Sequence, residues 1–282
     1  MRRHITSVVS NWFGDFAMST FSPWFQNIIN NSYVKLMKLD MSEFRDPSTY
    51  ETLNRLFTRR LEVAREINTA NNSIISPVDA KVTSAGRINH GFSYQIKGME
   101  YKIENLFGEH HKDAVKKLEG GEYINFYLSP KDYHRYHMPT TMQIKSMTHI
   151  AGKLYPVNIP FLYKKENLFI ENERVIIEGI DRFGNLFIMV LVGALNVGKM
   201  IVSFEPKVQT NTQGDSVTHF KYKNLWIEKG KQFGYFQMGS TVLLFMPKGI
   251  AHRFAMDGDS VRYGKMVAKY HNVGEQAWLL GR

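Results

Sequence analysis

The sequence predicts an α+β protein, in which an amino-terminal helical region precedes a mainly antiparallel β-sheet core. Apolar residues recur at helical spacing over residues 1–70, and short β-branched and aromatic stretches separated by Gly, Asn and Asp follow residue 71. The chain has 282 residues, 43% of them hydrophobic and 22% charged, which is enough for a sizeable core and excludes a disordered chain. We therefore predict a helical region over 1–70 and a β-rich domain over 71–282.

Three amphipathic segments make up the predicted helical region. The first has large apolar residues on one face between Ile5 and Phe16, the second runs from Trp24 to Leu39, and the third covers Leu53–Leu61. Such faces either pack on the rest of the protein or, with basic residues nearby, lie in a bilayer interface. Periodicity alone favours packing.

Seven short segments of the second region predict strands, with turn residues between them. These are Lys81–Ser84, Ser93–Ile96, Tyr123–Leu128, Arg174–Glu178, Leu186–Val192, Lys199–Ser203 and Thr241–Phe245. The sequence Asp-Arg-Phe-Gly-Asn over Asp181–Asn185 predicts a hairpin turn between two of them, and Glu119–Gly121 predicts another break.

Composition narrows the classes of partner and chemistry. The chain contains 36 Lys and Arg against 26 Asp and Glu, a formal charge of +10, which favours an anionic partner such as a membrane surface or nucleic acid. It has no cysteine, which excludes disulfides, thiolate metal sites and a cysteine nucleophile and favours a reducing compartment. No signal peptide and no apolar run of about 18 residues is visible. Any membrane contact is therefore expected to be peripheral.

Three separated polar positions could together carry nucleophilic catalysis. His134 and His137 lie in a dense polar cluster after the predicted strand Tyr123–Leu128, Asp79 follows a proline turn, and Ser240 precedes a hydrophobic strand. Asp79, His137 and Ser240 supply an acid, a base and a nucleophile, although each alone is more often a solvated or hydrogen-bonded residue. We expect no metal, because no third ligand accompanies the two histidines. The nucleophile elbow of an α/β-hydrolase is absent.

The chain resembles the phosphatidylserine decarboxylase proenzymes of the bacterial, pyruvoyl-dependent type. The resemblance rests on Ser76–Asp79 (Ser-Pro-Val-Asp), on the histidine motif Tyr127–Pro139, on Met238–Thr241 (Met-Gly-Ser-Thr) and on the glycine-containing segment Val192–Gly198. These motifs occur in consistent order over roughly residues 48 to 247. One departure is Ala80, where the family usually has glycine after the aspartate; a positive φ there would cost about 1 kcal/mol.

The resemblance implies a chain that cuts itself between Gly239 and Ser240, leaving a β chain of residues 1–239 and an α chain of residues 240–282. Ser240, activated by His137 with Asp79 supporting the imidazole, attacks the Gly239 carbonyl to form an ester, and β-elimination then leaves dehydroalanine. Hydrolysis of the dehydroalanine releases ammonia and leaves a pyruvoyl group as covalent cofactor. A Schiff base between that group and phosphatidylserine then allows loss of CO2 and release of phosphatidylethanolamine. His134 is expected to serve this decarboxylation.

The resemblance also implies partners and a location. The substrate lies in a bilayer, so we expect part of residues 5–39 to insert into an anionic membrane surface, on the cytoplasmic side of the cell membrane, and we expect a dimer of αβ units. Three other hypotheses stay open: an Asp-His-Ser serine hydrolase without self-cleavage, an inactive lipid-binding relative, and, with least weight, a basic nucleic-acid-binding protein with Tyr133 and Tyr136 as stacking residues. We expect no nucleic acid as partner.

Overall fold

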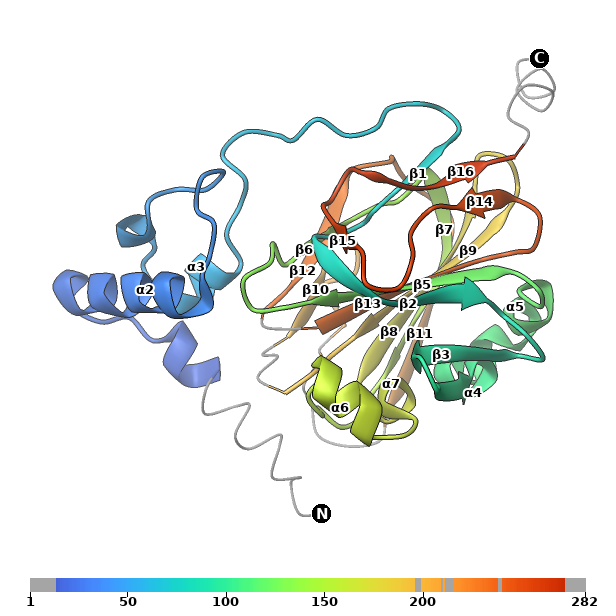
Figure 1. Cartoon of the computed structure of the whole chain (residues 1–282), viewed down its shortest axis with the longest axis horizontal. Coiled ribbons are helices and arrows are strands. Elements are labelled where there is room, and N and C mark those ends of the chain that lie inside the picture. The colour runs from blue at the N-terminus through green and yellow to red at the C-terminus, as the bar shows by residue number, and fades with distance from the viewer. Residues whose placement is uncertain (1–13, 196–198, 209, 211–215, 238–239, 272–282) are drawn as a thin grey trace.

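The computed structural model describes residues 14–195, 199–208, 210, 216–237 and 240–271. Helices gather in the amino-terminal region and on one side of the sheets, and the elements are arranged as in Figure 1. Residues 14–18 are helical, and the other helices are α2 (Pro23–Met37), η1 (Pro47–Thr49), α3 (Leu53–Phe57), α4 (Ile103–Phe107), η2 (Glu109–His111), α5 (Lys112–Lys117), α6 (Ile159–Lys164) and α7 (Leu168–Glu171). None of the helices in these ranges is long and apolar enough to cross a membrane.

The strands form four antiparallel groups. An eight-stranded sheet has the order β11-β7-β8-β9-β13-β5-β2-β15, two three-stranded sheets have the orders β10-β12-β6 and β1-β16-β14, and β3 pairs with β4. The bounds are β1 (Ser73–Ile75), β2 (Ala80–Arg87), β3 (Phe92–Ile96), β4 (Met99–Lys102), β5 (Glu122–Leu128), β6 (Arg135–His137), β7 (Met142–Ile150), β8 (Arg174–Asp181), β9 (Leu186–Val192), β10 (Met200–Val202), β11 (Val217–Ile227), β12 (Gln232–Phe236), β13 (Ser240–Met246), β14 (Ala251–Arg253), β15 (Ser260–Val261) and β16 (Met266–Tyr270).

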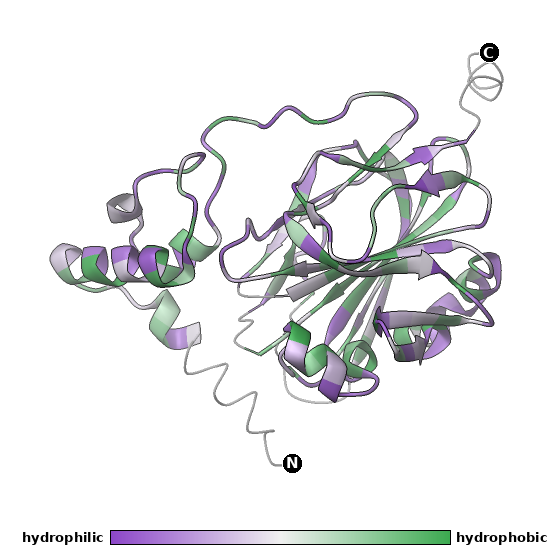
Figure 2. Ribbon diagram, viewed as in Figure 1, coloured by the Kyte–Doolittle hydropathy of each residue, from purple (hydrophilic) through white to green (hydrophobic). Residues whose placement is uncertain are grey.

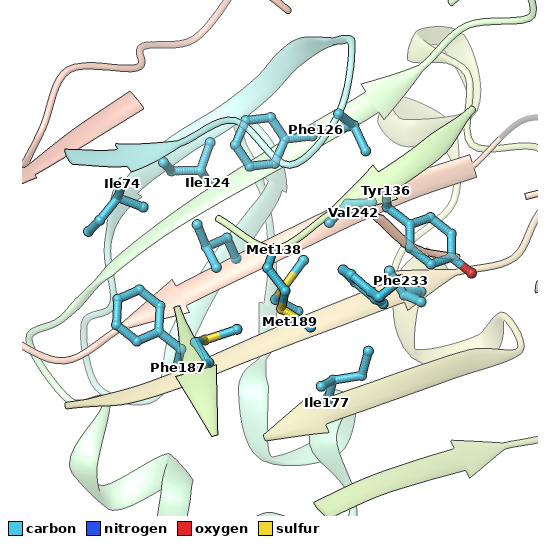
Figure 3. Packing of buried hydrophobic residues seen from close by; sticks show 14 of the residues in the cluster. Ile74, Ile124, Phe126, Tyr136, Met138, Ile177, Phe187, Met189, Phe233 and Val242 are labelled. Atoms are coloured by element: carbon cyan, nitrogen blue, oxygen red, sulfur yellow. The ribbon is translucent and has the colours of Figure 1, made fainter. Parts of the chain in front are cut away.

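The eight-stranded sheet is the middle layer of the β-rich region. One of its faces packs on the two three-stranded sheets through a buried apolar cluster that includes Phe126, Tyr136, Phe233 and Val242 (Figure 3). Its other face packs on α4 to α7 and the β3–β4 hairpin through a second cluster. Because both faces are covered, every residue of β9 and β13 is buried; β9 is apolar throughout, and β13 is apolar from Val242 onward.

The predicted α+β fold is confirmed, and each of the seven predicted strands coincides with an observed one. The turn at Asp181–Asn185 joins β8 to β9, and the Asp181 carboxylate accepts hydrogen bonds from the backbone N–H groups of Phe183 and Asn185, both at 2.8 Å. The third predicted helix is too long, because α3 ends at Phe57 and not at Leu61. The first predicted helix, from Ile5 to Phe16, falls largely outside the described residues.

Helix α2 packs with its polar side inward. It begins at Pro23, which needs no N–H partner in the first turn, and ends at Lys38 in the left-handed conformation. Its buried residues are Gln26, Asn30 and Tyr33. The Asn30 amide donates to the carbonyl oxygens of Pro47 and Tyr50 at 2.9 and 2.8 Å, which ties α2 to η1.

Its outer side exposes several large apolar residues. Hydrophobic residues are interspersed with polar ones around the helix (Figure 2), and the exposed fractions are 66% for Trp24, 50% for Ile28 and 75% for Leu36. An aqueous surface helix would ordinarily show the opposite arrangement.

Candidate active site

The histidine motif follows β5 and leads into β6, the edge strand of the β10-β12-β6 sheet. The Asp132 carboxylate accepts hydrogen bonds from the backbone N–H and the hydroxyl of Ser129, both at 2.7 Å, and this closes the turn after β5. His134 and His137 are both buried, with exposed fractions of 0% and 5%. The turn therefore returns the chain so that both imidazoles enter the interior.

His137 has one nitrogen fixed as a donor. Its Nδ1 lies 2.9 Å from the Gly230 carbonyl oxygen, which can only accept, so Nδ1 carries the proton and Nε2 carries the lone pair. That lone pair accepts from the Tyr133 hydroxyl at 3.1 Å. Burial is the main cause that lowers the pKa of His137 to about 4, so the imidazole is neutral at pH 7.

His134 has the same tautomer and a free second nitrogen. Its Nδ1 donates to the Asp132 carbonyl oxygen at 2.8 Å, whereas its buried Nε2 has no hydrogen-bond partner. The Phe57 ring of α3 lies 4.0 Å from the imidazole, centroid to centroid. Burial, with a smaller contribution from the positive charge of Arg59, lowers the pKa of His134 to about 3.

Asp79 precedes β2 and is bound by an arginine that sequence reasoning did not identify. Arg65 approaches it with both terminal nitrogens, at 2.6 Å from Oδ1 and 2.9 Å from Oδ2, and also binds Glu43. The backbone N–H of Tyr263 donates to Oδ1 at 2.8 Å. The next residue, Ala80, is not among the positive-φ residues and lies in β2, so the missing family glycine causes no backbone strain.

Asp79 and His137 meet through Tyr263 and not directly. Within the described residues no hydrogen bond joins them; the Tyr263 backbone binds Asp79, and its ring stacks on the His137 imidazole at 3.6 Å, 19° from parallel. The Tyr263 hydroxyl also donates to the Gly230 carbonyl oxygen at 2.9 Å, the acceptor that His137 uses. The structure thus shows an indirect link through Tyr263, and the support of the His137 imidazole by Asp79 stays a prediction.

Ser240 is the first residue of β13, between β9 and β5. It pairs with Leu128 at the end of β5, directly before the turn that leads to the histidines. Alternation along the strand places Ser240 on the same face as Val242, toward the layer that contains β6. Its hydroxyl is fully buried and has no hydrogen-bond partner among the residues that the structure describes. Met238 and Gly239 lie outside the described residues.

A cavity of about 570 Å³ opens beside Asp79, between the helical region and the ends of β2 and β5. The side chains that line it include Asp79, Tyr127, Ser129 and Tyr133, together with basic residues from both regions.

The glycine segment Val192–Gly198 contains a packing glycine. A Cβ at Gly193 would lie 3.3 Å from the Glu173 carbonyl oxygen, so this glycine serves close packing. Gly198 lies outside the described residues.

Two arginines bind the helical region and the histidine motif to each other. Arg135, between the two histidines, donates from Nε and Nη2 to the Thr58 carbonyl oxygen at the end of α3, at 3.0 and 2.6 Å. Arg59, directly after α3, donates from Nη2 to the carbonyl oxygens of Lys131 and Asp132 at 2.7 and 3.1 Å. We call this pair of contacts the arginine exchange. No sequence motif indicated the role of Arg59.

A buried serine at the start of β13, facing the layer that contains β6, and two buried neutral histidines in and before β6 define a β-sheet enzyme with the components of serine-based self-processing. The family model for phosphatidylserine decarboxylase matches residues 53–269. Similar proteins include the phosphatidylserine decarboxylase proenzymes of Helicobacter pylori, 40% identical over 95% of this chain and 98% of that protein, and of Campylobacter jejuni, 40% identical over 92% and 97%. That of Brevibacillus brevis is 38% identical over 79% and 80%.

The chain belongs to the phosphatidylserine decarboxylase proenzyme family. It is thus a self-processing decarboxylase that is cleaved into α and β chains and depends on a serine-derived pyruvoyl group.

Proposed function

We propose that Ser240 is the processed serine, that the chain is cut between Gly239 and Ser240, and that the α chain of residues 240–282 then carries the pyruvoyl group with which the αβ unit decarboxylates phosphatidylserine to phosphatidylethanolamine. The observation that carries this proposal is the Ser240 hydroxyl, fully buried and without a partner at the start of β13. A buried hydroxyl ordinarily finds a partner, so an unpartnered one is free to act as nucleophile. The pyruvoyl group, once formed, supplies an electrophilic carbonyl and an electron sink.

His137 serves as the base in self-cleavage. Its Gly230 contact fixes the tautomer in which Nε2 has the lone pair, and burial keeps the imidazole neutral at pH 7. The Tyr133 hydroxyl now occupies that lone pair and must rotate away, or pass its own proton on, before Nε2 accepts the serine proton. Asp79 supports His137 as a positioning residue, because it holds the Tyr263 backbone whose ring covers the imidazole.

His134 serves the decarboxylation stage. Its Nε2 is the imidazole nitrogen of the pair without a hydrogen-bond partner, and once this nitrogen takes up a proton it can donate to the substrate carboxylate or deliver the proton that replaces CO2. Phe57 and the Asp132 carbonyl oxygen fix the ring from two sides. A lone pair without a protein partner is what a substrate contact at this nitrogen requires.

The helical region attaches the enzyme peripherally to the membrane, on its cytoplasmic face. The polar inner side of α2 is bound to η1, which leaves Trp24, Ile28 and Leu36 facing outward. Insertion of these side chains into the interface would remove apolar surface from water near a lipid substrate. Two αβ units associate as a dimer, as the family resemblance implies.

The intact mass of the denatured protein tests the processing site. We expect a fragment of residues 240–282 that is lighter by one ammonia than the unmodified peptide. Ser240→Ala should remain a single uncut chain without activity, whereas the exposed Ser203→Ala should process normally. A wild-type chain that stays intact on long incubation would contradict the proposal and favour a serine hydrolase or an inactive relative; a cut elsewhere would exclude Ser240.

A further inference from the structure

A second cavity, of about 410 Å³, lies between η1, α3 and Arg135. Neither Asp79 nor Ser240 lines it, and of its lining residues Arg59 alone also lines the Asp79 cavity. It is rich in guanidinium groups: its basic lining residues are Arg45, Arg55, Arg59, Arg60 and Arg135. Its acidic lining residues are Glu51 and Glu62.

Two of these arginines are buried without an anionic partner. Arg59 is 2% exposed and Arg135 is 5% exposed, and within the described ranges neither forms a salt bridge. Nε and Nη1 of Arg59 and Nη1 of Arg135 have no hydrogen-bond partner. Burial lowers the pKa of both guanidinium groups. A buried cation with donors left over is costly unless an anion approaches it.

The remaining arginines extend the positive charge to the cavity rim. Arg45 is neutralised by Glu62 at 2.8 Å, whereas Arg55 and Arg60 are exposed and the structure gives neither an ion pair. Planar guanidinium groups match the oxygen geometry of phosphate, with which they form paired hydrogen bonds. The lining therefore fits a phosphate group better than a neutral ligand.

We propose that this cavity binds the phosphate of an anionic phospholipid that is not the reacting substrate. The cavity belongs to the helical region, which also exposes Trp24 and Leu36, so a lipid headgroup at the same interface can reach it. The lipid source rests on the proposed membrane attachment, whereas the affinity for phosphate rests on the arginines alone.

Vesicle sedimentation with Arg55→Gln/Arg60→Gln tests this site, since both side chains are exposed and the change keeps helix propensity. The matched control is Lys116→Gln/Lys117→Gln on α5, which removes the same charge at the opposite end of the molecule (Figure 1). On phosphatidylcholine vesicles all three proteins should bind alike. With added phosphatidylglycerol the wild type and the control should gain affinity, and the arginine variant should fall about 25-fold below them, about fivefold per arginine.

A parallel measurement separates the sources of phosphate: thermal unfolding with inorganic phosphate against chloride at equal ionic strength. One outcome is that phosphate stabilises the wild type but not the arginine variant, while the variant binds vesicles as well as the wild type does. That result would assign the cavity to a free anion and overturn the lipid proposal. If both double variants lost vesicle binding equally, the net charge of the protein would explain the loss. That result would also overturn the lipid proposal. A wild type that binds no vesicle would refute membrane attachment and the lipid source together, and the phosphate measurement would still report whether the cavity takes an anion.

Discussion

Self-cleavage should withstand acid far better than ordinary histidine chemistry does. A base works only when deprotonated, and burial places the pKa of His137 near 4, compared with about 6.5 for a free histidine. At pH 5.5 a free histidine is about 10% neutral, whereas a group with a pKa of about 4 is about 97% neutral. We therefore expect the first-order cleavage rate at pH 5.5 to keep most of its value at pH 7.5, and to fall steeply only as the pH approaches about 4.

The same shifts make the fold itself sensitive to acid. The folded-state pKa values of about 4 for His137 and about 3 for His134 lie below the unfolded value, so the folded protein binds fewer protons. Stability is complete above about pH 6.5 and decreases as the pH falls toward those values. For His137 alone the loss is of order 3 kcal/mol once the pH is below about 4.

The cleavage rate is measured on freshly translated precursor that is diluted into buffers from pH 7.5 to pH 4. Gel separation of the two chains then gives the cleaved fraction over time. Circular dichroism at each pH identifies the point at which unfolding begins, and rates below that point are excluded. A rate that falls tenfold between pH 7.5 and pH 5.5 while the fold is intact would show that the base titrates like an exposed histidine. The assignment of the buried His137 would then be wrong.

Three further outcomes follow from the geometry. Asn30→Ala should destabilise the docking of α2 by about 2–4 kcal/mol, because two buried carbonyl oxygens lose their donor, and hydrogen exchange of the α2 amides should accelerate. The control Asn31→Ala, at an exposed position, should change the free energy of docking by less than about 0.5 kcal/mol. Arg65→Met should slow self-cleavage at least about tenfold, as judged by precursor accumulation, since Asp79 loses both arginine contacts, whereas Arg45→Met should not. His134→Ala should yield cleaved chains without decarboxylation, and an uncut His134→Ala would move that residue to maturation.

The strands with long apolar runs were the most readily predicted from sequence. β9 is a continuous apolar run and β13 is one from Val242 onward, and such runs predict buried strands directly. β6 consists of Arg135, Tyr136 and His137, and most residues of β11 are exposed or only partly buried, so neither has an apolar pattern to detect. Edge and functional strands are held by pairing with their neighbours, which a local pattern does not report.

In the candidate site, too, local motifs reveal some residues and only the tertiary structure reveals others. Motifs place Asp79, His134, His137 and Ser240, but nothing local links Asp79 to Arg65, because that contact depends on how the segment between α3 and β1 crosses the domain. The exposure of Trp24, Ile28 and Leu36 on α2 was also hidden, since periodicity identifies apolar residues but not which of them face the protein. Tertiary packing supplies this information.

The arginine exchange limits how this protein can be shortened. Arg59 holds the loop before His134, Arg135 holds the end of α3, and Phe57 packs on His134, so α3 is structurally part of the catalytic domain although it lies before residue 71. A version for work in solution that begins after α2 would keep these contacts, whereas one that begins at residue 71 would remove one wall of the histidine site. The contacts of Arg59, Arg135 and Phe57 therefore make α3 a part that any shortened version has to keep together with the histidine site.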